Sequence, residues 1–261
     1  MNAPSPSIID LDTVDSTNLE ARRRIADGRI ADGTIVTARE QTGGRARRGR
    51  SWTSPKGNLY WTRVAFPQPG WPPVWGLSMV CGLAVLDLAR AALPADVPVA
   101  LKWPNDVLVA GGKLAGILLE SGDGDGRPWV ICGIGVNLVF SPPTGQLYAA
   151  ADLLSQGAVE IDRDRAVHDL AGHFDRRLSA YLDGGLPAIR AAVMEHLAGI
   201  GGPIIARITD DPADDVTGTL RGLDDQCRAE IVTADGTVRA ISAGDLFFGA
   251  PSPSPDRQQP G

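Results

Sequence analysis

Four arginines, Arg45, Arg47, Arg48 and Arg50, lie in the segment 43–52, which reads Gly-Gly-Arg-Ala-Arg-Arg-Gly-Arg-Ser-Trp. Neither a helical nor a strand period runs through them, so the segment is predicted to be a mobile loop. The guanidinium groups repel one another, and each would gain about 1 to 4 kcal/mol from an opposite charge ~4 Å away, depending on how far water is excluded. We therefore expect this segment, the arginine loop, to become ordered when it closes over an anion.

A nucleic-acid contact is the alternative interpretation of the arginine loop. However, the chain has 31 acidic and 25 basic residues and a net charge of -6. No second basic stripe is present that could follow a phosphate backbone. The charge balance favours a local site for an anionic ligand.

Short neutral polar side chains occupy Ser16, Thr17 and Asn18, directly after a predicted strand. Thr17 and Glu20 form the pattern of a capping box, which predicts the start of a helix. A helix cap alone would explain these residues. The first turn of a helix also offers unpaired N–H groups, so the segment is a candidate site for a small polar ligand group.

A second group of polar residues follows Pro104, which is expected to end a strand and leave Asn105 and Asp106 at its end. Lys113 stands at the start of an otherwise apolar strand. A half-buried lysine there would require an anion, whereas a solvated lysine at a strand end is the alternative. Gly116 interrupts the same strand and indicates close approach of backbone or ligand.

Familiar nucleotide and metal motifs are missing from the sequence. The run from Gly133 to Leu138 lacks the third glycine of a dinucleotide fingerprint, and Gly112-Lys113 is followed by Leu instead of the Ser or Thr of a Walker A loop. Neither a G-x-S-x-G hydrolase motif nor a familiar metal-site spacing of the three histidines is present. Cys81, Cys132 and Cys227 are expected to be buried thiols.

A lysine and a closing arginine loop suit the activation of a carboxylate by ATP. That reaction brings two anions together and forms a mixed anhydride, so cations must neutralise both reactants and a lid must exclude water. The amine that accepts the activated acyl group is expected to come from a partner protein, because the chain contains no evident internal acceptor.

The elements that must position these residues follow from hydrophobic periodicity. Strands are predicted at 8–14, 33–40, 59–66, 97–101, 107–109, 113–120 and 129–138, and helices at 17–25, 76–93, 164–182 and 186–197. Five short strands are predicted further on, at 204–208, 216–223, 227–232, 237–241 and 246–248.

This order predicts a large domain over residues 8–200 and a small β-barrel over 201–250, with flexible tails at 1–7 and 251–261. No run approaches the roughly 18 apolar residues of a membrane span, and no signal sequence precedes the first strand. We expect a cytoplasmic protein.

In chain order, the polar motifs resemble those of the bacterial biotin protein ligases, the biotin-[acetyl-CoA-carboxylase] ligase family. The matching motifs are Ser16-Thr17-Asn18, Gln41, Gly44 to Arg50, Lys102 to Asp106, and Lys113 to Leu118. The resemblance is strong from Val14 to Asn137 and looser in the C-terminal part. It implies an α+β fold, in which helices flank a mixed β-sheet in the catalytic domain and a small SH3-like β-barrel follows.

The resemblance also implies roles for individual residues. The residues implied for biotin are Ser16, Thr17 and Asn18 at the ureido ring, with Gln41, Gly44, Arg45, Ala46, Arg47, Lys113 and Gly116. The residues implied for ATP are Arg50, Trp52, Asp106, Lys113 and Asn137. Lys113 and Arg47 would be catalytic, Trp52 would stack, and Asp106 would lie near the phosphates or magnesium.

The implied reaction converts biotin and ATP, with Mg²⁺, to biotinyl-5'-AMP and pyrophosphate. Biotin is then transferred to one lysine of a biotin carboxyl carrier protein, such as a subunit of acetyl-CoA carboxylase. Some members also carry a DNA-binding domain, for which there is no room before Ile8 here, so neither DNA nor a membrane is expected as a partner. A homodimer is compatible with the resemblance.

One residue departs from the family motifs, and two other functions are alternatives to this interpretation. Ala46 stands where the family often has glycine, and a positive φ there would cost roughly 1 kcal/mol. A lipoate or octanoyl transfer enzyme of similar fold is the closest alternative, but the arginine loop and the Lys-Trp-Pro-Asn-Asp run favour biotin. A non-catalytic nucleic-acid-binding module is the alternative from another class.

Overall fold

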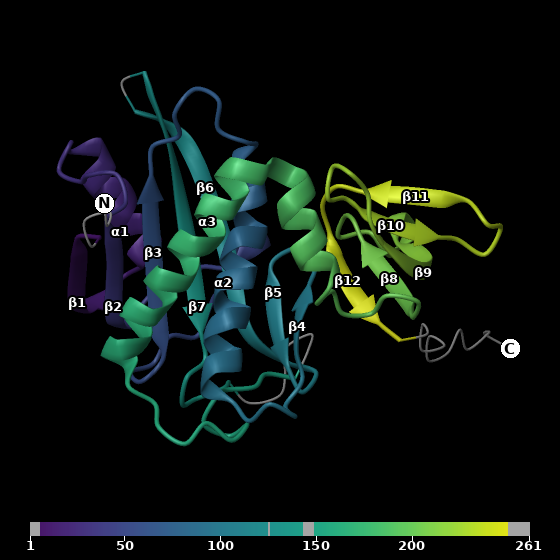
Figure 1. Ribbon diagram of the computed structural model, residues 1–261, viewed down its shortest axis with the longest axis horizontal. Helices are drawn as coiled ribbons and strands as arrows, with labels where there is room; N and C mark the ends of the chain where they lie inside the picture. The colour runs from purple at the N-terminus through teal and green to yellow at the C-terminus, as the bar shows by residue number, and fades with distance from the viewer. Residues whose placement is uncertain (1–5, 125, 143–148, 250–261) are drawn as a thin grey trace, which may run out of the picture. The chain divides into compact units, whose positions relative to one another are not determined.

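A computed structural model of the protein describes residues 6–124, 126–142 and 149–249 (Figure 1). The chain divides into two compact units, Met1–His196 and Leu197–Gly261. The sequence places the boundary slightly later, after residue 200. The predicted tails lie largely outside the described residues.

Unit 1 is built on a seven-stranded mixed sheet with the order β1-β2-β3-β7-β6-β5-β4. β1 and β2 run parallel, and the other neighbouring strands are antiparallel. The strands are β1 Ile8–Val14, β2 Ile35–Gln41, β3 Leu59–Ala65, β4 Val99–Lys102, β5 Asp106–Val109, β6 Gly112–Gly124 and β7 Arg127–Val136. The mixed sheet expected from the sequence is confirmed.

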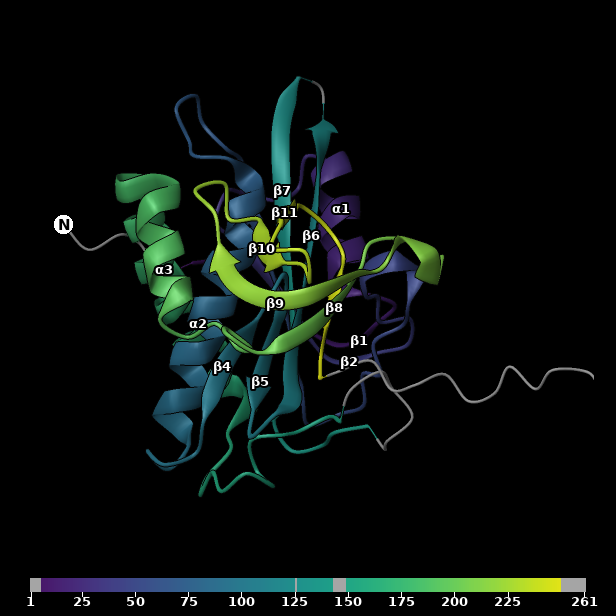
Figure 2. The same cartoon turned by 90° about the vertical axis from the view of Figure 1, so that its right-hand side faces the viewer.

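Helices cover both faces of this sheet, as Figure 2 shows. In β3 the side chains alternate: Thr62 bonds to α1, whereas Trp61 stacks against Phe174 of α3 with ring centroids 5.4 Å apart. α1 therefore covers one face, and α2 and α3 lie on the other. These helices are α1 Thr17–Ala26, α2 Leu77–Ala92 and α3 Arg163–Met194.

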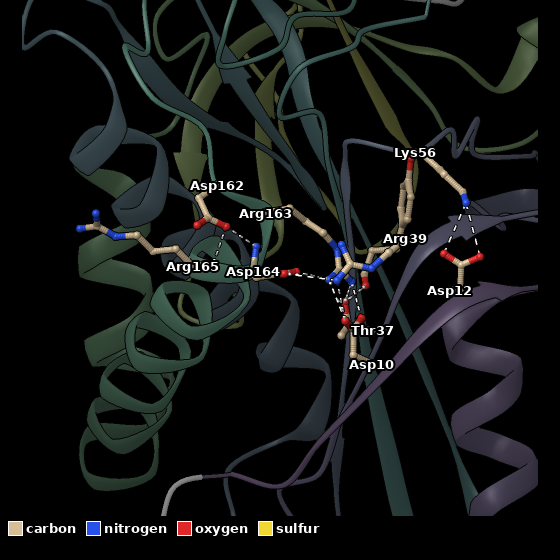
Figure 3. A network of polar contacts seen from close by, with 10 residues as sticks. Asp10, Asp12, Thr37, Arg39, Lys56, Asp162, Arg163, Asp164 and Arg165 are labelled. Atoms are coloured by element: carbon tan, nitrogen blue, oxygen red, sulfur yellow. Dashed lines mark hydrogen bonds and ion pairs between the residues drawn. The ribbon is translucent and has the colours of Figure 1, made fainter.

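Helix α3 contains a break between the two helices that the sequence predicts at 164–182 and 186–197, at the pair Gly184-Gly185. Its backbone leaves the helical region at Gly185, where φ is 61°, so 163–194 consists of two helical segments. The N-cap is Asp162, whose carboxylate accepts hydrogen bonds from the backbone N–H groups of Asp164 and Arg165. Arg163 reaches across to Asp10 of β1 and Thr37 of β2, at 2.8 Å each, and so fixes the start of α3 against the parallel strand pair (Figure 3).

Helix α2 is the apolar centre of unit 1. The segment Val74–Ala92 is long and apolar enough to cross a membrane by length and composition, which the sequence analysis did not anticipate. However, 67% of its apolar window is buried inside the protein. The core helix of a globular protein, when mostly buried, passes the same test of length and composition.

The predicted capping box at the start of α1 is wrong. Ser16 is the N-cap and makes no side-chain capping bond. The Thr17 hydroxyl lies 3.2 Å from the Gln41 Oε1, and Glu20 pairs with Arg23 and Arg24. Tertiary partners have replaced the local cap.

Unit 2 contains a five-stranded antiparallel sheet with the order β11-β10-β9-β8-β12. Its strands are β8 Pro203–Arg207, β9 Val216–Leu223, β10 Ala229–Val232, β11 Val238–Ile241 and β12 Asp245–Phe248. Each of the five predicted strands is present. Among the described residues no pairing joins β11 to β12, so closure into a barrel stays a prediction.

Candidate active site

Neutral side chains from the start of α1, from β2 and from β3 form a largely buried group, the neutral cluster, made of Ser16, Thr17, Asn18, Gln41 and Thr62. Gln41 Oε1 accepts from the Thr17 N–H at 2.9 Å. Thr62 Oγ1 lies 2.8 Å from both the Thr17 Oγ1 and the Asn18 Oδ1. The cluster contains no charged group, and hydrogen bonds join Gln41 to Thr17 and Thr62 to Thr17 and Asn18.

Three glycines provide a flat surface beneath this cluster. Gly116 of β6 lies opposite Gly135 of β7, and Gly133 stands two residues before Gly135, so all three face the same side. A Cβ at Gly133 would overlap the amide of Asn18, and one at Gly135 would lie 2.6 Å from the Trp52 Nε1. The three residues, named here the glycine floor, allow side chains or a ligand to approach the backbone of the sheet. The close approach expected at Gly116 is confirmed, because a Cβ there would lie 3.2 Å from the Trp52 ring.

A charged cluster, made of Lys102, Asp106 and Lys113, lies at the other end of the glycine floor. Lys113 Nζ is 2.7 Å from the Asp106 Oδ1, and Lys102 Nζ is 3.6 Å from the Asp106 Oδ2. Lys102 is 3% exposed and Asp106 is also buried. Of the two readings of Lys113, the half-buried one is correct: its side chain is 22% exposed and paired with an anion.

The two clusters are close enough for one small ligand to contact both. A Cβ at Gly116 would lie 3.5 Å from the Lys113 Nζ, whereas Asn18 rests on Gly133. Gly116 is level with Gly135, so the two contacts are one two-residue step apart along β7, about 7 Å.

The arginine loop starts and ends beside these clusters. Its ends pair through a bridge between Arg45 and Ser51, and Arg47–Gly49 forms a short 3-10 turn. Arg47 Nη1 donates to the Asn105 Oδ1 at 2.9 Å, which joins the loop to the turn between β4 and β5. The loop therefore has defined contacts here, although the sequence predicts no regular structure in it.

The backbone of the arginine loop shows no positive φ at Ala46. Ala46 has φ -129°, an extended conformation that alanine adopts without strain. The positive φ angles fall on Arg48, at 56°, and Gly49, at 70°. The expected cost at Ala46 does not arise in this conformation.

Gly44 and Trp52 make close contacts at the base of the loop. A Cβ at Gly44 would overlap the backbone carbonyl of Trp52 and lie 2.5 Å from the Ser54 Oγ. The Trp52 ring lies over the glycine floor, and the Lys113 Nζ is 5.5 Å from its centroid. In the described part of the chain, the buried Nε1–H of Trp52 has no hydrogen-bond partner.

Asn137 supports the charged cluster through the backbone. It is buried, and its Nδ2 donates to the carbonyls of Lys113 and Ala151 at 3.3 and 3.0 Å. A direct role at ATP stays a prediction, as does the role of Arg50, whose Nε donates to the carbonyl of Arg47 at 3.3 Å.

The sequence analysis missed three polar residues of this site. Thr62 links Thr17 to Asn18, Ser54 accepts from the Gln41 Nε2 at 2.9 Å, and Glu120 accepts from the Asn18 Nδ2 at 2.9 Å. The strand period offered one signal, because Glu120 shares a face of β6 with Gly116. The other two could be found only from strand pairing.

A protein-held metal ion does not fit these residues. Both carboxylate oxygens of Asp106 face ammonium groups, and the described residues contain no group of three His, Cys, Asp or Glu side chains that could bind a metal.

Asp15, just before the neutral cluster, pairs with Arg23 at 2.8 Å. This contact lowers the pKa of the Asp15 carboxyl to about 2.

The arrangement combines uncharged recognition with charge neutralisation. The neutral cluster can bind a polar group without a charge, while the lysines and Arg47 can stabilise a carboxylate and a phosphate. Activation of a carboxylic acid by a nucleotide needs both functions side by side.

Comparisons with known proteins agree with this chemistry. Residues 11–137 match the biotin/lipoate A/B protein ligase family, and residues 203–249 match the biotin protein ligase C-terminal domain. A biotin–[acetyl-CoA-carboxylase] ligase of Paracoccus denitrificans is 40% identical over 241 residues, covering 90% of this chain and 98% of that protein. A ligase of the same description from Mycobacterium tuberculosis is 35% identical over 236 residues, covering 88% and 85%.

A solved structure is also similar to the whole chain. The biotin protein ligase of Aquifex aeolicus in complex with biotin and ATP has a TM-score of 0.77 and 25% identity, covering 93% of this chain and 98% of that structure.

Proposed function

The chain belongs to the biotin/lipoate A/B protein ligase family, and from that premise we propose how its residues carry out the reaction of a biotin–protein ligase. The protein is an ATP-dependent ligase that activates biotin and transfers it to a carrier protein. A carboxylate oxygen of biotin attacks the α-phosphorus of ATP, and pyrophosphate leaves. The carrier lysine amine then attacks the acyl carbon, and AMP and a proton are released.

The neutral cluster is proposed to bind the ureido ring of biotin. That ring is uncharged and carries both N–H donors and a carbonyl acceptor, so hydroxyl and amide groups match it without burying a charge. The contact residues proposed are Ser16, Thr17, Asn18 and Gln41, with Gly44, Arg45, Ala46 and Gly116 around the rest of biotin.

Lys113 is proposed to act in the chemical step. Its ammonium would neutralise the biotin carboxylate and the α-phosphate as the two anions approach, and it would stabilise the charge that develops in the transition state. In this structure Asp106 holds the ammonium over the glycine floor. The acidic partner thus orients Lys113 for an incoming anion.

The arginine loop is proposed to close over the adenylate. Arg47 would contact the phosphate and exclude water from the mixed anhydride, which hydrolyses readily. Arg50, Trp52, Asp106 and Asn137 are proposed for the ATP side. ATP is expected as its magnesium complex, with the metal brought by the phosphates because these residues do not fit a protein-held ion.

One observation carries the assignment. The Lys113 ammonium lies near Gly116 and the Asn18 amide lies on Gly133, on the same face of the sheet and at levels about 7 Å apart along β7. This spacing suits a ligand with a neutral polar head and a carboxylate tail, which describes biotin.

The decisive experiment is ATP–pyrophosphate exchange with purified protein and magnesium, with biotin, with lipoate and with neither. Exchange that depends on biotin alone supports the proposal. Exchange with lipoate would assign the protein to the other branch of the family, and salt-sensitive nucleic-acid binding without exchange would support the non-catalytic alternative.

Partners and location are proposed at a finer level. We propose a biotin carboxyl carrier subunit of acetyl-CoA carboxylase as the acceptor, since both relatives named above are described as biotin–[acetyl-CoA-carboxylase] ligases.

We also propose an edge for a homodimer. Residues 118–124 of β6 pair with β7 but lie beyond the register of β5, which leaves an edge on which a second copy could pair. Sedimentation with and without biotin and ATP would test this, and cell fractionation would test the proposed cytoplasmic location.

A further inference from the structure

Glu120 joins two parts of the site. Its side chain is 17% exposed, and its Oε2 accepts from the Asn18 Nδ2 at 2.9 Å. Its Oε1 accepts from the Arg45 Nη1 at 3.0 Å, and the Arg22 guanidinium approaches the same oxygen at 3.5 Å. One carboxylate therefore contacts both the neutral cluster and the start of the arginine loop.

A chain of hydrogen bonds connects the neutral cluster to the other end of the same loop. The Ser54 hydroxyl donates to the carbonyl of Trp52 at 2.9 Å and accepts from the Gln41 Nε2 at 2.9 Å. Gln41 in turn accepts from Thr17. From Thr17 the contacts continue through Thr62 to Asn18 and Glu120. The series runs from the end of the loop at Trp52 to its start at Arg45.

We propose that Glu120 is a positioning residue that couples biotin binding to closure of the arginine loop. The inference rests on the proposed function of the neutral cluster and assigns to that site a residue that touches neither reactant. It acts through Asn18 on one side and through Arg45 on the other.

Glu120 fixes the orientation of the Asn18 amide. Its Nδ2 hydrogens are directed at the Glu120 carboxylate and, at 3.3 Å, at the carbonyl of Leu118. An ionised carboxylate only accepts hydrogen bonds, so it fixes the amide with its nitrogen toward β6 and its oxygen toward Thr62. The remaining acceptor site of that oxygen is then available to an N–H of the ureido ring.

Glu120 also fixes the position of Arg45 at the start of the arginine loop. Arg45 is the first arginine of the loop, and its charge-assisted bond to Glu120 holds it against β6. A shift of Asn18 on ligand binding would move the shared carboxylate, and with it the start of the loop. Arg22 lies on α1 and not in the loop, and its Nη1 is 3.5 Å from the Glu120 Oε1, so it does not link Glu120 to the loop.

Glu120→Gln is the test, because the amide keeps the volume but can no longer accept on both atoms. The matched control is Glu20→Gln: Glu20 is 18% exposed and also pairs with two arginines, Arg23 and Arg24, but contacts neither Asn18 nor the loop. We expect Glu120→Gln to raise the KM for biotin in the exchange assay about tenfold, the loss typical of a hydrogen bond to a charged group. The release of biotinyl-5'-AMP should become several-fold faster, while Glu20→Gln changes neither.

Arg45→Ala provides a second, independent test that leaves Glu120 in place. Coupling predicts that this loop variant also raises the KM for biotin, and that the double variant with Glu120→Gln releases the adenylate no faster than the more affected single variant. Thermal unfolding and circular dichroism establish that each variant is folded. Because Arg45 is itself proposed to line the biotin site, a raised KM in Arg45→Ala supports the coupling only together with this double variant. If Glu120→Gln does not fold, Glu120→Asp, which keeps the charge but draws it back from Asn18 and Arg45, takes its place in both assays.

An unchanged KM for biotin in Arg45→Ala, or unchanged adenylate release in a folded Glu120→Gln, would overturn the coupling while leaving the proposed function intact. Wild-type protein without biotin-dependent exchange would overturn both. The two failures are therefore distinguished by the wild-type assay.

Discussion

The neutral cluster and the charged cluster lie over the same glycine floor but are built in opposite ways. Thr17 bonds to both Gln41 and Thr62, so the neutral cluster is held in place without a ligand. In the charged cluster one aspartate contacts two lysines, and the Lys113 side chain is 22% exposed. The difference indicates that biotin recognition is preformed, whereas the catalytic end requires its anionic substrates to complete its electrostatics.

The largest effect is expected from Lys113→Gln. Loss of the ammonium removes stabilisation that is realised mainly in the transition state, so the exchange rate should fall by about 10²- to 10³-fold with a smaller change in the KM for biotin. Lys56→Gln, which removes an exposed lysine paired with Asp12, is the control. A raised KM with an unchanged rate would place Lys113 in the preformed part of the site.

Gly133→Ala tests the neutral cluster in the same assay. The added methyl group would overlap the Asn18 amide, and overpacking of this kind costs about 1 to 3 kcal/mol. We expect the KM for biotin to rise by about tenfold or more while the rate at saturation is largely kept. Gly172→Ala on α3, where the new methyl group would meet only the end of Arg176 at 3.6 Å, is the control. A fall in rate without a change in KM would contradict a purely recognising role.

Arg47→Gly separates chemistry from retention. Removal of the Arg47 contact with Asn105 and of its charge should speed release of biotinyl-5'-AMP by about tenfold, the value of one charge-assisted hydrogen bond. Activated biotin should then label lysines of unrelated proteins. Arg29→Gly, at an exposed arginine paired with Asp27, is the control. Unchanged adenylate release would defeat the proposed role of the loop as a lid.

The neutral cluster contains no side chain that titrates in acid, and Asp15, directly before it, is expected to give the start of α1 a pH dependence. Asp15 accepts from the Ser16 N–H and pairs with Arg23, and mainly the Arg23 hydrogen bond lowers its pKa from 3.8 to about 2. A lowered folded-state pKa stabilises the protein above pH 4, and this stability is lost as the pH falls toward 2. Because the pair is exposed, its contribution at pH 7 is about 1 kcal/mol at most.

Asp15→Asn should therefore unfold at lower urea concentration than the wild type at pH 7, and the difference should shrink below pH 4. Urea titrations at pH 7, 5, 4 and 3 provide the comparison. A difference that stays constant over this range would show that the effect comes from the α1 helix end and not from the ionised carboxylate.

The elements of both units were predictable from their hydrophobic periods, and glycine or proline marks the ends of several of them. The break at Gly185 and the close approach at Gly116 follow from the same local signals. The capping box failed because Gln41, which is distant in sequence, competes for Thr17. Glu120 was missed for a similar reason, since the pairing of β6 with β7 brings its carboxylate to Asn18.

Ala46→Gly is expected to have the smallest effect and tests the loop conformation itself. Ala46 is extended, and its N–H donates to the carbonyl of Arg50 at 2.8 Å, whereas the left-handed angles belong to Arg48 and Gly49. If the closed loop keeps this backbone, glycine only adds freedom to the open loop, which costs about 0.4 to 1 kcal/mol and speeds adenylate release about two- to fivefold. If closure instead requires a positive φ at position 46, glycine relieves strain and release becomes slower. The sign of the change in release rate therefore distinguishes two modes of closure. Faster release indicates that the arginine loop closes as a preformed unit, like the neutral cluster. Slower release indicates that its backbone changes conformation around the anion.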